Sequence, residues 1–431
     1  MIACLPNESK ENLHKGEIIT STSTSRPPMF NYATFCKVLS IHQINYRIRQ
    51  LLRNQPSISS QSLNGDLHMT TQEEVLKLLM SQSSLRKLTF SLNLSLSIPK
   101  ITSFPGAKVC LKNLSELCCD SDIYSEFFYQ LSQICHNLQS LNIMFYKVIS
   151  NGLSDLISAQ QNLKYLKIAR YWENEVLTAN IITSLSNLPN TLIKLDLYGN
   201  KRDIPLSFIT KFINLQEIII SYYNYYESDF KALQYVTFSK LQILKFQCEN
   251  PEHESLIKFL ENNGRNLKEF YSKCCENSLK LAIAEFCPNL RKLFTGCRIN
   301  ELEALKKIFN NCQYLESIKI WCGADYYLSE KVLLEVVAEY SPRNIHELKL
   351  CYEFDLESEL LLEELESFFI SWTKRIPQKS LSFIIIHDDA DTLVENDKNM
   401  QIIEIIEKYI ELGIIKEFKT VVYDTDYFCK Y

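Results

Sequence analysis

The residues that could carry out chemistry in this chain are scattered along it. Seven histidines occur among 431 residues and no two are closer than 26 positions, so no helix can present two imidazoles to a zinc ion. The nine glycines are at least 27 positions apart. Phosphate-binding loops and the G-x-S-x-G turn of hydrolases need glycines close together, so these motifs are excluded. We therefore expect no catalytic residues, no cofactor and no metal ion.

One acidic segment, residues 387–397, could in principle hold calcium. It lacks the glycine and the final bidentate glutamate of an EF-hand loop. Acidic residues also favour the N-terminus of a helix, and residues 401–413 that follow have helical spacing. We predict a solvated loop that leads into this helix, and a protein without enzymatic activity, because no set of titratable groups is placed to converge.

Composition narrows the possible partners and the compartment. The formal net charge is −5 and the pI about 5.9, so the chain has no overall attraction to nucleic acid or to an anionic membrane. No stretch reaches the roughly 18 apolar residues of a membrane span, and residues 1–15 are polar where a signal peptide would be apolar. We expect a cytoplasmic or nuclear protein whose fifteen cysteines are reduced thiols.

The elements of the chain follow a short repeated pattern. An apolar residue, two variable residues, an apolar residue, one variable residue and a third apolar residue recur at intervals of about 26 residues, which is a leucine-rich spacing. The pattern begins at Leu85, Leu114, Leu138, Leu163, Leu192, Leu215, Leu241, Leu267, Leu290, Leu315, Ile345 and Leu381.

Each repeat predicts one strand and one helix. The pattern alternates over its last four positions, as a strand with one buried face does. Segments between the strands have apolar residues three and four apart, which indicates helices over 73–82, 125–135, 254–263 and 301–309. Because one such unit cannot bury its apolar face alone, we predict an α/β solenoid, a horseshoe with parallel strands on the concave side and helices on the convex side.

Asparagine stands directly before the first apolar position of several repeats. Asn tolerates the left-handed conformation that closes many helices, which gives this placement a physical reason. The residues are Asn113, Asn137, Asn162, Asn214, Asn266, Asn289 and Asn344.

Residues 1–84 do not join the repeat. Residues 16–28 and 56–66 are rich in turn formers and read as linkers. Residues 30–54 between them have helical spacing, and we predict one or two helices that cap the first repeat. The expected organisation is an N-terminal linker and helical cap region over 1–84, followed by a leucine-rich-repeat domain of about twelve repeats over 85–431.

Three repeats carry a cysteine at one position. Cys135-His-Asn-Leu138, Cys287-Pro-Asn-Leu290 and Cys312-Gln-Tyr-Leu315 resemble the cysteine-containing, ribonuclease-inhibitor-like repeats of F-box proteins. The resemblance implies that each cysteine closes a helix and packs its thiol inward, which predicts buried structural thiols. The run Pro28–Lys37 is similar to the segment that links F-box and repeats in the expanded families of early-diverging fungi.

An F-box would occupy about forty residues ahead of this run. Leu5-Pro6-Asn7-Glu8 echoes its opening, but the residues that follow do not continue it, so we expect the F-box to be missing or truncated. The resemblance implies a protein that recruits a substrate for ubiquitination. The ubiquitin-ligase adaptor would be its second partner, and the missing or truncated F-box leaves binding of that adaptor open. The alternative is a stand-alone leucine-rich-repeat binding scaffold without a ligase link.

The variable positions of the strands are the expected binding surface. They should project from the concave face, where charges of both signs and aromatic rings suit a protein partner better than nucleic acid or a membrane. The third and fifth positions of the pattern give Tyr165, Lys167, Lys194, Asp196, Glu217, Ile219, Ile243, Lys245, Glu269, Tyr271, Lys292, Phe294, Ser317, Lys319, Glu347 and Lys349.

Aromatic residues are concentrated in the loops after three strands. They lie at 171–172, 222–226 and 321–327. Their rings either form binding hot spots along one rim or pack against neighbouring loops, and the residue types fit both interpretations.

Overall fold

The computed structural model divides the chain into two compact units, each described by itself. The N-terminal unit is Met1–Leu192 and the C-terminal unit is Ile193–Tyr431. The structure describes residues 2–15, 29–53, 65–90, 100–146, 148–170, 177–199, 204–222, 229–247, 250–273, 276–322, 327–352, 361–376, 379–387 and 397–422.

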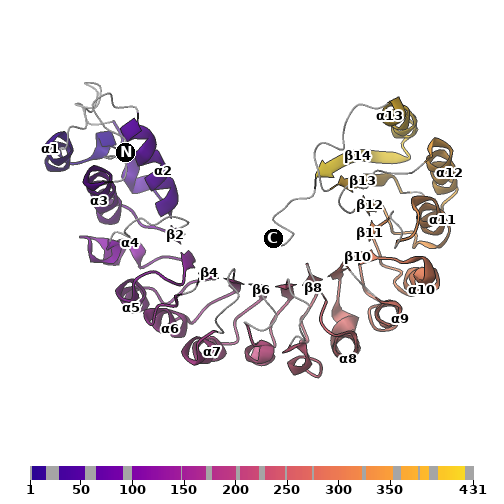
Figure 1. Ribbon diagram of the computed structural model, residues 1–431, viewed down its shortest axis with the longest axis horizontal. Coiled ribbons are helices and arrows are strands. Elements are labelled where there is room, and N and C mark those ends of the chain that lie inside the picture. Colours follow the sequence, from indigo (N-terminus) through magenta and orange to yellow (C-terminus); the bar gives the residue numbers. More distant parts are fainter. Residues whose placement is uncertain are drawn as a thin grey trace. The chain divides into compact units, whose positions relative to one another are not determined.

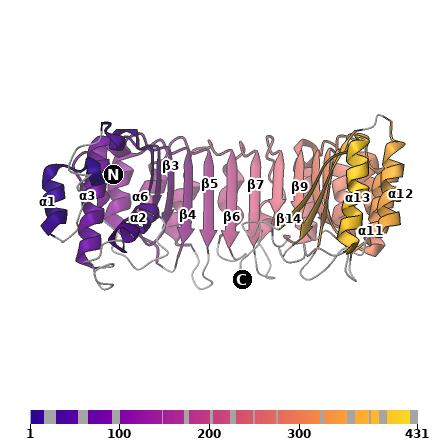
Figure 2. The same ribbon diagram turned by 90° about the horizontal axis from the view of Figure 1, so that it is seen from above.

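The strands of each unit form a parallel sheet in chain order. Neighbouring strands of the C-terminal unit run side by side in the same direction (Figure 2). The N-terminal unit contains β1 (Val38–Ser40), β2 (Lys87–Phe90), β3 (Glu116–Asp120), β4 (Ser140–Phe145) and β5 (Tyr165–Arg170). The C-terminal unit contains β6 (Lys194–Gly199), β7 (Glu217–Tyr222), β8 (Ile243–Phe246), β9 (Glu269–Ser272), β10 (Lys292–Gly296), β11 (Ser317–Trp321), β12 (Glu347–Cys351), β13 (Leu381–His387) and β14 (Ile415–Val422).

Helices cover the outer side of each sheet (Figure 1). In the N-terminal unit these elements are η1 (Ile2–Cys4), α1 (Asn7–Lys15), η3 (Tyr32–Phe35), α2 (Ile41–Arg53), α3 (Asp66–Gln82), η4 (Ile101–Ser103), α4 (Ala107–Leu111), α5 (Ser125–Ile134), α6 (Gly152–Ser158) and α7 (Ala179–Ser186). In the C-terminal unit they are η5 (Leu206–Lys211), η6 (Asp229–Ala232), α8 (His253–Asn263), η7 (Gly264–Asn266), α9 (Asn277–Phe286), η8 (Ile299–Glu301), α10 (Leu302–Asn311), α11 (Glu330–Tyr340), α12 (Leu362–Thr373) and α13 (Asp397–Glu411).

The fold is therefore an α/β leucine-rich-repeat solenoid, as the repeat predicted. Each of the twelve LxxLxL stretches contributes a strand, and from β2 to β12 the three pattern positions of each stretch are buried. In β4 burial alternates along the strand, and Leu138, Leu141 and Ile143 are fully buried. Burying one such side chain contributes about 1.5–3 kcal/mol, so the repeated apolar positions supply the driving force for stacking.

Two strands lie outside the predicted set. β1 falls in a stretch that was expected to be helical, and it pairs with β2 directly before α2. β14 follows the predicted helix α13 and pairs with β13. Both strands carry the same spacing in degenerate form, as Cys36-x-x-Leu39-x-Ile41 and Ile415-x-x-Phe418-x-Thr420, which the count of twelve repeats did not include. Pairing with a neighbouring strand completes these short or charged strands.

The register of β13 differs from the alignment of its LxxLxL stretch. Ser382 pairs with Glu347 and Phe383 with Leu348, so Phe383 takes the buried position that the pattern assigned to Ile384. The run Phe383-Ile384-Ile385-Ile386 is apolar on both faces, and such a run does not specify which face is buried. Tertiary pairing with β12 decided the register.

The asparagines before the repeats connect neighbouring turns through their side chains. Nδ2 of Asn266, Asn289 and Asn344 donates a hydrogen bond to a backbone oxygen of the preceding repeat, from Ser239, Arg265 and Gln313 respectively, at 2.8–3.1 Å. In the N-terminal unit, Asn162 donates to Asn137 at 2.8 Å. Their side chains thus link successive repeats by hydrogen bonds, a role beyond the backbone conformation for which we expected asparagine at these positions.

The three repeat cysteines close their helices and are fully buried. Cys135, Cys287 and Cys312 are the C-cap residues of α5, α9 and α10, as the family resemblance implied. Cys312 Sγ donates to the backbone oxygen of Cys287 at 3.3 Å, and Cys135 Sγ donates to that of Leu114 at 3.5 Å. Each of these two thiols thus connects its helix end to the preceding repeat.

Candidate functional site

Strand register aligns the variable side chains of the C-terminal unit into two rows. The third positions form one row, because Glu217 pairs with both Lys194 and Ile243, and Glu269 pairs with both Ile243 and Lys292. Ser317 and Glu347 extend this row. The fifth positions form the second row, which contains Asp196, Ile219, Lys245, Tyr271, Phe294, Lys319 and Lys349.

The remaining two predicted residues lie in the N-terminal unit. Tyr165 and Lys167 are in β5, where they pair with Ser140 and Asn142 of β4. Both side chains are half-buried. They form the corresponding rows of that unit, and each unit therefore has its own set of variable positions on the sheet face opposite the helices.

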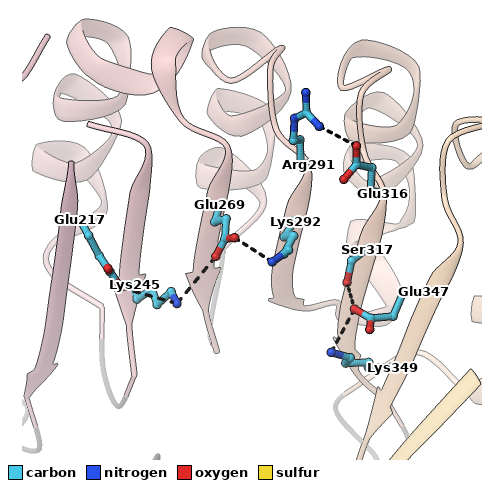
Figure 3. A network of polar contacts seen from close by, with 9 residues as sticks. All are labelled: Glu217, Lys245, Glu269, Arg291, Lys292, Glu316, Ser317, Glu347 and Lys349. Atoms are coloured by element: carbon cyan, nitrogen blue, oxygen red, sulfur yellow. Dashed lines mark hydrogen bonds and ion pairs between the residues drawn. The ribbon is translucent and has the colours of Figure 1, made fainter. Parts of the chain in front are cut away.

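Carboxylates and ammonium groups alternate across the third and fifth positions of the C-terminal unit (Figure 3). Glu217 lies 3.2 Å from Lys194 Nζ and 3.9 Å from Lys245 Nζ, and Glu269 lies 3.7 Å from Lys245 Nζ and 2.9 Å from Lys292 Nζ. The hydrogen bond to Glu269 raises the pKa of Lys292. Side chains in the middle of the row are about four-fifths buried, with 18–19% exposed for Glu217, Lys245 and Glu269. Reduced solvent contact strengthens these pairs relative to isolated surface pairs.

A third glutamate, Glu347, continues the row on β12. The Ser317 hydroxyl donates to Glu347, and Lys349 Nζ lies 3.0 Å from the same carboxylate. Burial raises the pKa of Glu347, but the hydrogen bonds from Ser317 and Lys349 outweigh it and hold the pKa below its usual value. Glu347 is therefore ionised and already partnered at neutral pH.

Three aromatic rings stand next to these charges. Tyr271 and Phe294 have ring centroids 6.3 Å apart, and Phe294 and Trp321 have centroids 6.1 Å apart. A lysine Nζ lies over each ring: Lys245 over Tyr271 at 4.6 Å, Lys319 over Phe294 at 4.5 Å and Lys273 over Trp321 at 4.8 Å. We call these six residues the lysine–aromatic strip. Cation–π attraction holds the lysine heads above the rings.

The strip continues into an apolar cluster. Phe294 and Trp321 pack with Cys351, Ile384 and Ile386, and all five are buried. Lys319 is largely buried beside them, and this burial lowers the pKa of Lys319, with the nearby Lys349 cation acting in the same direction. Phe294 is only 7% exposed, so Tyr271 and the lysines present most of the strip's surface.

Gly296 makes room within the strip. It lies between Lys273, whose backbone oxygen accepts its N–H at 2.9 Å, and Trp321, with which it pairs across the strands. A Cβ at this position would lie 2.6 Å from the Lys273 backbone oxygen and 2.9 Å from the Tyr327 ring. Only glycine allows this approach.

Trp321, Lys273 and Gly296 also belong to the concave face, although the sequence did not lead us to predict them there. Only the third and fifth positions of the pattern were counted, whereas β10 and β11 extend to the seventh position at Gly296 and Trp321, and Lys273 holds that position directly after β9. That continued alternation is the signal that could have identified them. Of the aromatic segments, Tyr222 and Trp321 are buried and Tyr327 is partly buried against the apolar cluster, as the packing interpretation predicted. Residues 171–172, 223–226 and 323–326 lie outside the described residues.

Other kinds of site are not seen in the described part of the chain. No group of three or more His, Cys, Asp or Glu residues is placed there to hold a metal ion. Among the same residues, no helix combines the length and apolar character needed to cross a membrane. The acidic loop at 388–396 lies outside the described residues, so the predicted solvated loop stays a prediction.

Comparison with known proteins adds little to this geometry. No known protein family matches the chain, and no curated protein matches it. Among solved structures, the chain is similar to a protein from Bacteroides fragilis with 13% sequence identity and a TM-score of 0.33. The match covers 56% of this chain and 66% of that one. A likeness this weak identifies neither fold nor function.

Proposed function

We propose that this chain is a non-catalytic binding scaffold and that a protein partner binds the concave face of the C-terminal unit. The observation that carries the proposal is the lysine–aromatic strip, whose accessible part is the half-buried Tyr271 ring and the lysine heads beside the alternating Lys–Glu row. Phe294 and Trp321 are buried and support this surface from below. The Tyr271 ring offers an aromatic contact, and fixed charges of both signs select the partner and its orientation.

The charge pattern favours a protein over nucleic acid. Glu217, Glu269 and Glu347 stand among the lysines of the same face, and a phosphate backbone would meet these carboxylates at every second or third strand. A protein segment that carries carboxylates next to apolar side chains fits both the lysine heads and the Tyr271 ring. Repeat solenoids usually bind partners on this face.

Site-specific cross-linking tests which face is used. A photoreactive amino acid replaces Lys292, which is exposed on the concave face, and in a matched chain it replaces Ile370, which is exposed on α12. We expect a discrete protein adduct from position 292 that position 370 does not give. Equal adducts at both positions, or none at 292, would remove the concave face from the proposal.

Charge reversal then tests the contact. Lys292→Glu should weaken binding of the cross-linked partner about tenfold, which corresponds to about 1.4 kcal/mol. Lys306→Glu is the control, because Lys306 also pairs with a glutamate, Glu303 at 2.9 Å, but on helix α10. Unchanged affinity of the Lys292 variant would contradict a partner on this row.

We further propose that the bound protein is a substrate recruited for ubiquitination. Support comes from the resemblance of the cysteine-containing repeats to those of F-box proteins and from the position of Cys135, Cys287 and Cys312 at helix ends. Pull-down of the full chain with the F-box adaptor of the ubiquitin ligase is the test. Absence of binding leaves the stand-alone scaffold, which the cross-linking experiment tests separately.

A further inference from the structure

The C-terminal unit ends in an open strand edge. β14 pairs with β13 and is the last strand in the sheet order, so one row of its backbone N–H and C=O groups has no neighbouring strand among the described residues. The strand is eight residues long, and its last four residues are exposed. Such an edge is a template for another strand and has to be protected or paired.

Apolar side chains lie at this edge in the part of the chain that the structure describes. The rings of Phe383 and Phe418 stack with centroids 6.0 Å apart and an interplanar angle of 25°, and Phe418 remains half-buried at the edge. On the neighbouring helix α13 and directly after it, Ile403, Ile410 and Leu412 are 45%, 39% and 60% exposed. Stacking another unit on such an edge would bury these side chains.

We propose that the edge of β14 binds the β14 of a second copy of this chain, antiparallel, about a two-fold axis at Phe418. In an antiparallel pair, residues directly opposite each other point their side chains to the same face of the sheet, and successive residues of one strand alternate between the faces. The two-fold axis therefore has to pass through one residue of the strand, because an axis between two residues would oppose side chains from different faces. The strand sequence then decides between the possible centres, because residues directly opposite each other interact through their side chains.

The neighbouring centres give a poorer match. Centring on Lys416, Glu417 or Lys419 brings two like charges opposite each other, and centring on Thr420 places Lys419 opposite Val421. Centring on Phe418 places Glu417 opposite Lys419 twice, once on each side of the axis, within the part of β14 that pairs regularly with β13. It also continues the Phe383–Phe418 stack with a second Phe418 ring.

Charged residues on an edge strand usually prevent pairing with another strand. In this register, Glu417 and Lys419 of one copy lie opposite residues of the other sign in the second copy and attract them. Glu417 and Lys419 lie on one face of the strand, because they are two positions apart, and they already pair within the chain. Around the two-fold axis, Glu417 and Lys419 of both copies form a closed square in which carboxylates and ammonium groups alternate. The edge therefore fits a second copy better than an unrelated strand.

Sedimentation equilibrium of the full chain over a wide concentration range tests the proposal. We expect a dimer. A monomer at all concentrations would overturn it, as would an open series of larger species, which would indicate head-to-tail association of β14 with the β1 edge of another copy.

Charge exchange tests the register. Lys419→Glu sets two carboxylates opposite each other twice and should weaken the dimer at least about tenfold. Combining Glu417→Lys with Lys419→Glu restores opposite charges and should recover the dimer, while Lys416→Glu, opposite Thr420, should leave it unchanged. A dimer unaffected by Lys419→Glu, or not recovered by the double exchange while thermal unfolding shows an intact fold, would refute this register.

Discussion

Lys280 Nζ of α9 lies 2.7 Å from Glu301 Oε2 of η8, and both side chains are buried in the C-terminal unit. Glu301 also accepts the backbone N–H of Arg298 at 2.8 Å, so the carboxylate is held by a cation and by a main-chain donor. The pair joins two successive repeats inside the fold, where water does not compensate a lost partner.

Removing one partner of this pair should strongly destabilise the unit. Lys280→Met leaves the Glu301 carboxylate buried without its cation, and we expect a loss of about 3–5 kcal/mol in the free energy of unfolding, measured by urea denaturation. Combining it with Glu301→Leu should recover most of the loss. Lys306→Met, which breaks a pair whose carboxylate, Glu303, is exposed to water, should change little. Similar losses in both single variants would contradict the role of burial.

Arg375 closes the end of helix α11 and should be irreplaceable by lysine. Its guanidinium donates to the backbone oxygens of Val337, Ala338, Ser341 and Pro342 at 2.6–3.2 Å and stacks 4.2 Å from the Trp372 ring centre. Burial lowers the pKa of Arg375 to about 10, which still leaves it charged at neutral pH. We expect Arg375→Lys and Arg375→Met each to lower the free energy of unfolding, measured by urea denaturation, by about 3 kcal/mol. The single ammonium of lysine cannot reach these acceptors together, and methionine has no donor for them. Full stability of the lysine variant would show that charge alone suffices.

Gly296 should tolerate no side chain. We expect Gly296→Ala to destabilise the unit by about 1–3 kcal/mol and to change tryptophan fluorescence, because the added Cβ displaces the Lys273 backbone or the Tyr327 ring beside Trp321. Gly413→Ala is the comparison, since Gly413 has φ +70° and open space around it. It should cost about 1–2 kcal/mol from backbone strain while leaving the fluorescence unchanged. Identical spectra of both variants would argue against a tight contact at Gly296.

His68 should make the N-terminal unit sensitive to acid. Its ring is fully buried, and this burial lowers the pKa of His68 below the usual 6.5, with the Arg49 cation acting in the same direction. The unfolded chain then protonates first as the pH falls below about 6.5, so stability is lost in that direction, and above that pH His68 has no effect. Thermal unfolding of wild type and His68→Leu between about pH 5 and about pH 8 should therefore show a smaller acid-induced drop in the variant. Parallel pH curves would exclude His68 as the cause.

The helix-capping cysteines should resist alkylation until the chain unfolds. Burial raises the pKa of Cys135 to about 11 and of Cys312 to about 12, and it raises the pKa of Cys287 well above its usual value. At about pH 8 almost no thiolate is present at these positions, and the reagent has no access. Peptide mass spectrometry after iodoacetamide treatment should find the partly exposed Cys4 labelled and these three unlabelled, with all four labelled in denaturant. Early labelling of Cys312 would contradict its burial.

The sequence by itself determined the repeating unit. Leucines such as Leu138 and Leu141 recur at the spacing of a strand with one buried face, and the resemblance to cysteine-containing repeats implied that Cys135 and Cys312 close their helices. Local periodicity is sufficient here because each repeat contacts mainly its neighbours.

Tertiary structure decided what the repeat pattern left open. The register of Phe383 depends on the adjacent strand, because an Ile-rich run specifies no face of its own. The repeat placed Tyr271 and Phe294 on one face, but packing between parallel strands decided that Phe294 is buried with Trp321 and that a lysine lies over each ring of the lysine–aromatic strip. The pattern specifies the face on which a residue lies, and only the stacked strands specify how its side chain packs there.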